Sequence, residues 1–259
     1  ILFIVFCVLS YAQNINLVNF NSSDSYTPGS GVSVHINPTG IFAFENAANL
    51  QDASNNSFIL ELSGPGGDFT NPTVLNTVYD FYTSLINGVL PSGLASGQYK
   101  LRVRSTQPAL TVETNLFTVD NSSSNSVPSV ETSMDSNSNF TQCLNEDANI
   151  INPYIGSMNQ NYNSLTSSMP SSYKFFTVSP TDASNTISVT LFDVDTGTST
   201  SLSAVSGNIY QIPDGLAVGT YNFEVEETDS SGNVSVFGYA FLFHTSATIF
   251  GNASSETVC

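Results

Sequence analysis

Apolar and polar residues alternate with a period of two along most of the chain. In GVSVHIN (31–37) the valines and the isoleucine fall on one face, and Ser33, His35 and Asn37 fall on the other. This alternation is typical of a β-strand with one buried face. Further strands are predicted over SFILELSG (57–64), QYKLRVRS (98–105), NLFTV (115–119), KFFTV (174–178), NTISVTLFDV (185–194), YNFEVEET (221–228) and VSVFGYAFLF (234–243). Because turn residues separate these strands and no helical period appears, we expect an all-β fold.

One phrase occurs twice, 122 residues apart. LPSGLASGQYKLRV (90–103) and IPDGLAVGTYNFEV (212–225) are identical at seven of their fourteen positions. In each copy a proline and two glycines predict a tight bend, with positive φ available at the glycines, and a tyrosine opens the next strand. A tyrosine in this place can bury its ring and return its hydroxyl to nearby backbone, as in the tyrosine corner of immunoglobulin-like sandwiches. Tyr99 and Tyr221 are therefore predicted to be structural residues of two equivalent bends.

The repeat and the length of 259 residues predict two tandem immunoglobulin-like, Greek-key β-sandwiches. The first sandwich covers residues 13–119. The following DNSSSNSVPSVETSMDSNSN is rich in Ser and Asn and has no sustained apolar period, which predicts a linker over 120–142. The second sandwich covers 143–259 and begins with an irregular Asn/Ser-rich stretch.

The two repeat segments also resemble a known group of proteins. LPSGLASGQYKLRVRSTQPALTVETNLFTV resembles the Ig-like modules of secreted surface proteins from the Bacteroidetes, and IPDGLAVGTYNFEVEETDSSGNVS is similar to repeats of their large gliding and adhesion proteins. The resemblance implies a Greek-key sandwich, export by the general secretory route, and display outside the outer membrane of a Gram-negative bacterium. Such proteins usually end in a sorting domain, which is not visible here. Either the chain is part of a longer protein, or the expectation of display fails.

The N-terminal residues predict a secretory signal peptide over residues 1–12. ILFIVFCVL (1–9) is an apolar run too short to span a bilayer, and small residues follow it at the positions that a signal peptidase reads. Cleavage is expected after Ala12, which makes Gln13 the first residue of an exported chain. No later apolar run is long enough to cross a membrane, so no transmembrane segment is predicted.

Two cysteines remain after removal of the signal peptide. Cys143 and Cys259 bracket the second half of the chain, and an oxidised pair would close a loop of more than a hundred residues. Cys259 is also the last residue, and it can instead belong to a following module. Both alternatives are open from the sequence.

Composition and charge narrow the possible partners. Hydrophobic residues make up 40% of the chain and charged residues 10%, which is enough apolar material for a core. Against 4 Lys and Arg stand 21 Asp and Glu, giving a net charge of −17. A surface of this sign repels phosphate backbones and anionic membranes, so nucleic acid is not an expected partner.

Catalytic signatures are weak throughout the sequence. FDVDTGTS (192–199) resembles the active-site loop of aspartic peptidases, but that chemistry needs two carboxylates sharing a proton, and Asp-Thr-Gly occurs once. The alternating residues on either side predict a hairpin turn instead. The two histidines, His35 and His244, stand near no candidate nucleophile in the sequence, and no nucleophile elbow, zinc motif or phosphate loop is present. We therefore predict that the chain is not an enzyme.

Calcium is the one ligand for which the sequence offers candidates. Four aspartates in or beside predicted turns can supply the hard oxygen ligands that this ion prefers: Asp193, Asp195, Asp214 and Asp229. Their spacing matches no EF-hand loop, and turn formation alone also explains them. No other cofactor is predicted.

The two repeats differ in charge at equivalent positions. Lys100, Arg102 and Arg104 lie on the predicted outward face of one strand, and their equivalents in the second copy are Asn222, Glu224 and Glu226. Residues up to 119 carry a net charge of −4 and the remainder −13. The basic stripe (Lys100, Arg102 and Arg104) can meet the acidic face of another molecule or an anionic glycan. Two differently charged, solvated faces are the alternative.

The leading hypothesis is a non-catalytic, exported surface protein whose modules act as a stalk or an adhesive segment. Its expected partners are other surface proteins or glycans. The alternative is a lectin-like, glycan-binding module, with or without calcium, in which Tyr154, Tyr162 and Tyr173 stack on sugars. The absence of Trp disfavours this alternative, because indole offers the largest stacking surface.

Overall fold

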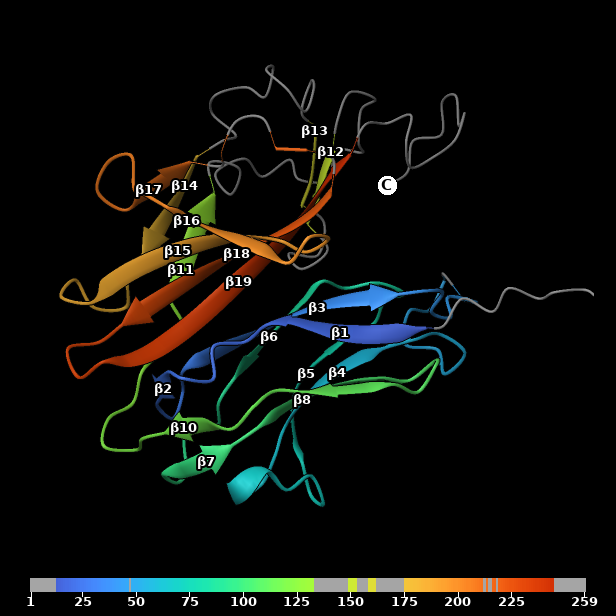
Figure 1. The fold of residues 1–259 in the computed structure, drawn as a ribbon, viewed down its shortest axis with the longest axis horizontal. Helices are drawn as coiled ribbons and strands as arrows, with labels where there is room; N and C mark the ends of the chain where they lie inside the picture. Colours follow the sequence, from blue (N-terminus) through green and yellow to red (C-terminus); the bar gives the residue numbers. More distant parts are fainter. Residues whose placement is uncertain are drawn as a thin grey trace, which may run out of the picture.

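The strands form two sandwiches that lie side by side (Figure 1). The computed structural model describes residues 13–46, 48–132, 149–152, 158–161, 175–211, 213, 216–217 and 219–244. Residues 13–119, called the first half below, form the blue-to-green strands of Figure 1, and residues 129–244, the second half, form the yellow-green-to-red strands. Within the described residues the single helical element is the short 3₁₀ turn η1 (Pro65–Gly67). The prediction of an all-β fold is confirmed for the described residues.

Two antiparallel sheets, with strand orders β1-β3-β6 and β5-β4-β8-β9, build most of the first half. The predicted strand at 98–105 is divided at Lys100, because β7 pairs with β10 while β8 pairs with β4. The strands of this half are β1 (Asn14–Asn19), β2 (Ser25–Tyr26), β3 (Gly31–Thr39), β4 (Phe58–Leu62), β5 (Thr73–Val78), β6 (Leu85–Val89), β7 (Gly97–Tyr99), β8 (Leu101–Ser105), β9 (Thr111–Glu113) and β10 (Phe117–Val119).

The second half has the same two-layer plan. The long strands β15, β18 and β19 form one layer, and the sheet β11-β14-β17 forms the other. Phe176 of β14 stacks on Phe223 of β18, with ring centroids 4.6 Å apart, and so joins the two layers. The strands are β11 (Ser129–Thr132), β12 (Asn149–Asn152), β13 (Met158–Asn161), β14 (Phe175–Ser179), β15 (Thr186–Asp193), β16 (Thr198–Leu202), β17 (Ile209–Gln211), β18 (Gly219–Thr228) and β19 (Asn233–His244).

The core of the first half is made by the alternating apolar residues that the sequence marks. Val32, Val34 and Ile36 of β3 are at most 1% exposed. They belong to one buried cluster with Phe58, Leu60, Leu62, Leu101, Val103 and Phe117 from the facing strands. Each fully buried side chain of this size stabilises the fold by about 1.5–3 kcal/mol. The period of two therefore places the core correctly in these strands.

The two-residue strand β2 joins the halves. Its backbone pairs in parallel with β10, where Tyr26 lies opposite Val119, and with β19, where Tyr26 lies opposite Val234. One sheet therefore runs in the order β16-β15-β18-β19-β2-β10-β7 through both halves. Val234 and Val236 of β19 also belong to the buried cluster of the first half. The sandwiches thus share a sheet and part of a core.

The beginning of the predicted linker is held between the halves. The Asn125 backbone amide donates to Oγ1 of Thr27 at 3.0 Å, and the hydroxyl of Ser235 donates to the carbonyl of Ser126 at 2.7 Å. β11 begins nine residues into the range 120–142, and residues 133–142 lie outside the described residues. The boundaries at 119 and 143 stay predictions, but Asn125 and Ser126 are bound to residues of the two halves.

The two repeated bends have the same geometry. The hydroxyl of Tyr99 donates to the carbonyl of Ala95 at 2.9 Å, and that of Tyr221 donates to the carbonyl of Ala217 at 3.1 Å. Both rings are buried, and in each bend the ring packs over the glycine two residues before it. Neither Gly97 nor Gly219 adopts a positive φ. A Cβ would lie 3.5 Å from the Tyr99 ring at Gly97 and 3.6 Å from the Tyr221 ring at Gly219, which are ordinary contact distances.

We expect Tyr99→Phe and Tyr221→Phe each to lower the free energy of unfolding by about 1 kcal/mol or more. Each change leaves a carbonyl of the bend without its hydroxyl partner. Urea unfolding followed by circular dichroism measures the effect. Tyr79→Phe, at a ring that is 41% exposed, is the control and should change little. A cost at one bend and none at the other would contradict their equivalence.

Candidate functional site

The polar face of β3 is buried against the second half. Ser33 and His35 are 1% and 0% exposed, although alternation places them opposite the core residues. They face β18 and β19, where Asn222 is 0% and Glu224 8% exposed. We call this contact, formed by β3 and β6 on one side and β18 and β19 on the other, the seam. It gathers polar and titratable side chains from both halves.

A chain of hydrogen bonds at the seam orients the imidazole of His35. The Ser84 hydroxyl donates to Oδ1 of Asn222, and Nδ2 of Asn222 donates to the Ser84 carbonyl. This orientation aims the same Nδ2 at Nδ1 of His35, 3.1 Å away, so Nδ1 accepts. His35 therefore carries its proton on Nε2, which donates to Oε2 of Glu224 at 2.7 Å.

The side chain of Asn87 on β6 forms the hydrogen bonds to the β19 backbone that a neighbouring strand would otherwise form. Its side-chain amide donates to the carbonyl of Gly238 at 2.8 Å, and its side-chain oxygen accepts from the Gly238 amide at 3.0 Å. The Ser33 hydroxyl donates to the same oxygen. Gly238 has to lack a side chain, because a Cβ would lie 2.7 Å from the Leu85 side chain. The backbone of β19 thus stays hydrogen-bonded where it meets the first half.

A pair of carboxyl groups lies at the same contact. Asp24 lies just before β2, and Glu226 lies on β18. Burial, together with the charges of Asp24 and Glu224, raises the pKa of Glu226 to about 7. Burial also raises the pKa of Asp24, and it raises the pKa of the adjacent Tyr26 hydroxyl well above its usual range.

The basic stripe lies on a different face, and its three side chains pair with two glutamates of the first half. Arg102 and Arg104 both bind the buried carboxylate of Glu61, with Nη2–O distances of 2.6 Å and 3.2 Å. The Arg102 guanidinium also lies 4.3 Å above the Phe69 ring. Lys100 pairs with Glu113 at 3.1 Å. The acidic face that the stripe was expected to meet on another molecule, at Glu224, is buried in the seam.

The candidate calcium ligands are not brought together. Asp193 and Asp195 share one hairpin turn, in which Oδ1 of Asp193 accepts from the amides of Asp195 and Thr196 and Gly197 has a φ of +70°. Asp193 lies opposite Tyr221 near the start of β18, and Asp229 follows the last residue of that strand. Seven strand residues lie between Tyr221 and Asp229, which separates Asp229 from the hairpin turn by roughly 25 Å. Asp214 lies outside the described residues. Among the described residues no group of three or more His, Cys, Asp or Glu is placed to hold a metal ion.

The Asp-Thr-Gly segment therefore forms a hairpin turn, as its flanking alternation predicts. Several other predicted sites lie outside the described residues: the cleavage site after Ala12, Cys143 and Cys259, and the tyrosines proposed to stack on sugars, Tyr154, Tyr162 and Tyr173. These stay predictions.

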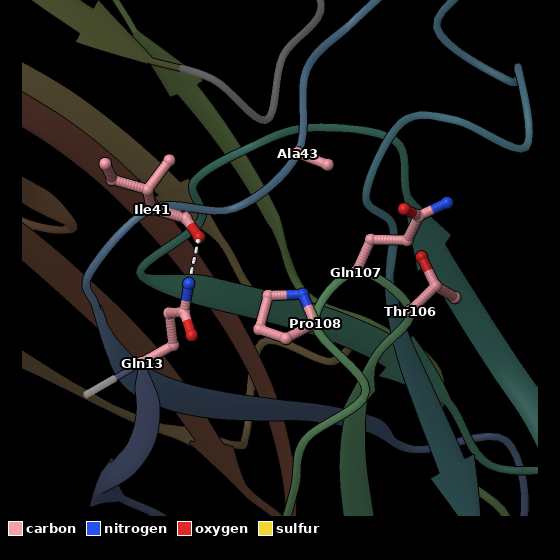
Figure 2. Close-up of a pocket in the computed structure, with 6 residues that line it drawn as sticks. All are labelled: Gln13, Ile41, Ala43, Thr106, Gln107 and Pro108. Atoms are coloured by element: carbon pink, nitrogen blue, oxygen red, sulfur yellow. Dashed lines mark hydrogen bonds between the residues drawn. The ribbon is translucent and has the colours of Figure 1, made fainter. Parts of the chain in front are cut away.

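Loops at one end of the first half surround an open hollow of about 550 Å³ (Figure 2). Its lining carries no charged, histidine or cysteine side chain; the six residues are Gln13, Ile41, Ala43, Thr106, Gln107 and Pro108. The Gln13 amide donates to the Ile41 carbonyl at 3.3 Å, which ties the start of the described chain to this rim. Thr106, the single hydroxyl of the lining, accepts from the Ser57 amide. Nothing in this lining can act as an acid, base or nucleophile at neutral pH.

The same end of the molecule exposes large apolar side chains. Phe44 and Phe81 meet edge to face with ring centroids 5.2 Å apart, and the Asn56 side chain donates to the Asp80 carbonyl, which joins the two loops. We call the exposed residues of these loops the loop-end patch: Ile41 (78% exposed), Phe44 (41%), Leu50 (48%), Tyr79 (41%) and Phe81 (51%).

Sequence reasoning did not find the seam. Its residues come from segments up to 204 positions apart, as Gly31 and Ser235 are, and no local pattern joins them. One signal was present: Asn222, Glu224 and Glu226 depart from the basic residues at the equivalent positions of the first repeat.

Comparisons with known proteins give only distant likenesses. No protein-family model matches the chain, and no curated protein is significantly similar to it. It is similar to the fibronectin(III)-like modules of CbhA from Clostridium thermocellum, with 12% identity over 93% of this chain and 100% of that one, and a TM-score of 0.25. It is also similar to the FN1–FN3 domains of chicken CNTN1, with 11% identity over 90% of this chain and 68% of that one, and a TM-score of 0.28. A third likeness is to dimeric latent PorU from Porphyromonas gingivalis, with 12% identity over 90% of this chain and 20% of that one, and a TM-score of 0.32. Likenesses this weak carry no argument about function.

We expect Glu61→Gln to lower the free energy of unfolding by about 2–4 kcal/mol. The change removes the one carboxylate that both guanidinium groups bind, and it leaves Arg102, whose side chain is 20% exposed, without its ionic partner. Thermal or urea unfolding measures this. The matched control is Glu113→Gln, which breaks the exposed pair with Lys100 and should cost less than about 1 kcal/mol. Equal costs for the two variants would show that the buried pairing has no special role.

Proposed function

We propose that the chain is a non-catalytic segment of an exported bacterial surface protein, in which it acts as a structural stalk or adhesion unit. The observation that carries this proposal is the sheet that continues through β2 from the first half into the second. A stalk has to transmit force without bending, and modules joined only by a linker rotate freely. A shared sheet with a shared core resists such rotation.

The seam adds to this stiffness. Hydrogen bonds between the halves are directional, so they fix one relative orientation where an apolar contact would tolerate several. Asn87, Ser84 and His35 of the first half each bind a specific group of the second.

The loop-end patch is the surface that we propose for adhesion. Function on a sandwich scaffold is usually carried by loops at its ends, because the scaffold holds them in place while they vary. Exposed aromatic and aliphatic side chains gathered in two neighbouring loops are the composition of a protein-contact surface. Among the described residues no helix has the length and apolarity needed to cross a bilayer.

Single-molecule pulling tests the stalk proposal. We expect the two halves of the full chain to unfold in one event, because β2 cannot leave β19 without also disturbing β10. Asn87→Ala removes three hydrogen bonds at the seam and should separate the event into two steps, with a loss of about 2–3 kcal/mol in stability. Gln98→Ala, at an exposed amide bound to Thr118 within the first half, is the control. Two independent steps in the unaltered chain would contradict the proposal.

A glycan-binding role is the second candidate, favoured by the aromatic content of the loop-end patch. Phe44, Tyr79 and Phe81 are exposed beside a loop rich in amide side chains, including Asn49 and Gln51. Aromatic faces pack on the C–H faces of sugar rings, and amides bind their hydroxyls.

A glycan array decides between the two roles. If the patch binds sugars, Phe44→Ala combined with Phe81→Ala should weaken every hit at least tenfold. Val74→Ala, at a valine that is 55% exposed on β5, should leave the hits unchanged. An array without reproducible hits, or hits that survive the double change, would leave the structural role alone.

A further inference from the structure

The loop-end patch combines exposed phenyl rings with acidic residues. The two loops that carry it, between β3 and β4 and between β5 and β6, contain no lysine, arginine or histidine. In the first loop Glu45 directly follows Phe44, and in the second Asp80 directly precedes Phe81. Each ring of the edge-to-face pair therefore has an acidic residue beside it in the chain.

The carboxylate of Asp80 is fixed in its loop, and no ion pair of the described residues includes it. Its Oδ1 accepts from the Phe81 amide at 2.7 Å. Burial nevertheless raises the pKa of the Asp80 carboxyl, because the ionised form has lost part of its hydration. A positive charge brought beside this carboxylate would offset the loss. Asp52, the remaining acid of these loops, differs in that Ser54 and Asn46 both donate to its carboxylate.

The described part of the chain has no cation to place at the patch. Lys100, Arg102 and Arg104 are paired with glutamates of β4 and β9. The imidazole of His35 is fully buried in the seam. A positive charge at the patch therefore has to come from another molecule.

The first half shows how a phenyl ring and a carboxylate hold a guanidinium group together. The Arg102 guanidinium lies 4.3 Å from the centroid of the Phe69 ring, and its Nη2 lies 2.6 Å from Oε2 of Glu61. The face of a phenyl ring carries partial negative charge, so ring and carboxylate attract the same cation. The loop-end patch offers both kinds of group, and its exposed Ile41 and Leu50 can pack on the alkyl stem of a long basic side chain.

We propose that the loop-end patch binds an arginine- or lysine-bearing surface of another protein, with the cationic side chain on the rings of Phe44 and Phe81 and beside the carboxylates of Glu45 and Asp80. This inference rests on the adhesive role proposed for the patch, and it specifies the chemistry of the partner. A second copy of this chain fits poorly, because it has 4 Lys and Arg against 21 Asp and Glu. An anionic glycan fits poorly as well, because the two carboxylates repel it.

The test measures the binding of two fluorescent peptides to the full chain. Both have the same leucine-rich sequence, in which two central positions are arginine in one peptide and citrulline, the uncharged isostere of arginine, in the other. We expect the arginine peptide to bind roughly tenfold more tightly at low salt. The difference should shrink at about 0.5 M salt, where charges on the surface are screened.

Substitutions locate the binding. Phe81→Ala and Asp80→Asn should each weaken binding of the arginine peptide roughly three- to tenfold. Asp68→Asn is the matched control for charge, because Oδ1 of Asp68 likewise accepts an amide of its own turn, from Thr70, and the change should leave binding unaltered. Glu45→Gln, at an exposed glutamate, repeats the charge test if Asp80→Asn folds poorly.

Three results would overturn the proposal. Equal binding of the two peptides, lost in Phe81→Ala, would exclude the cationic partner and leave the patch as the adhesive surface. A preference for arginine that survives both Phe81→Ala and Asp80→Asn would place the peptide elsewhere on the acidic chain. Absence of binding by either peptide would exclude the proposed partner, and the stalk role would still be judged by the pulling experiment.

Discussion

The structure depends on the pairing of β2 with two other strands at once. This strand has only two residues, Ser25 and Tyr26, yet it supplies hydrogen bonds to β10 on one side and to β19 on the other. Because strands in one sheet have a fixed spacing and direction, this pairing fixes where the second half lies relative to the first. β3 and β6 are then forced against β18 and β19. The polar seam is a consequence of that placement.

Burying a polar face imposes a condition that an apolar contact does not. Every donor and acceptor removed from water has to find a partner, or the contact costs about 1–3 kcal/mol per orphaned group. At the seam this condition is met by side-chain amides whose nitrogen donates and whose oxygen accepts. Asn87 binds the backbone of Gly238 in this way, and Asn222 accepts from Ser84 while it donates to His35. Such a contact forms in one orientation only. The hydrogen bonds therefore fix the orientation of the two halves, and the apolar cluster that includes Val234 and Val236 stabilises their contact.

The sequence predicts the layers of each sandwich well and their relation poorly. The period of two identified the core faces of β3, β4 and β8, and the repeat identified two bends whose tyrosines form the same hydrogen bond. Both signals are local, so a single sequence carries them. The seam depends on strand order and register between distant segments, which alternation does not specify. For the same reason the polar face of β3 was expected to contact solvent, although it packs on the second half.

The two repeats use equivalent positions for opposite purposes, and this explains the distribution of charge. In β8 the outward face carries Arg102 and Arg104, and both pair with one buried glutamate from β4. In β18 the same face carries Asn222, Glu224 and Glu226, and the first half covers it. A chain with four basic residues cannot place a lysine or arginine beside every buried acid. At the seam the imidazole of His35 takes that role, because its Nε2 donates to the Glu224 carboxylate. An acidic chain can thus bury a carboxyl group between its own halves where a hydrogen-bond donor of the other half meets it.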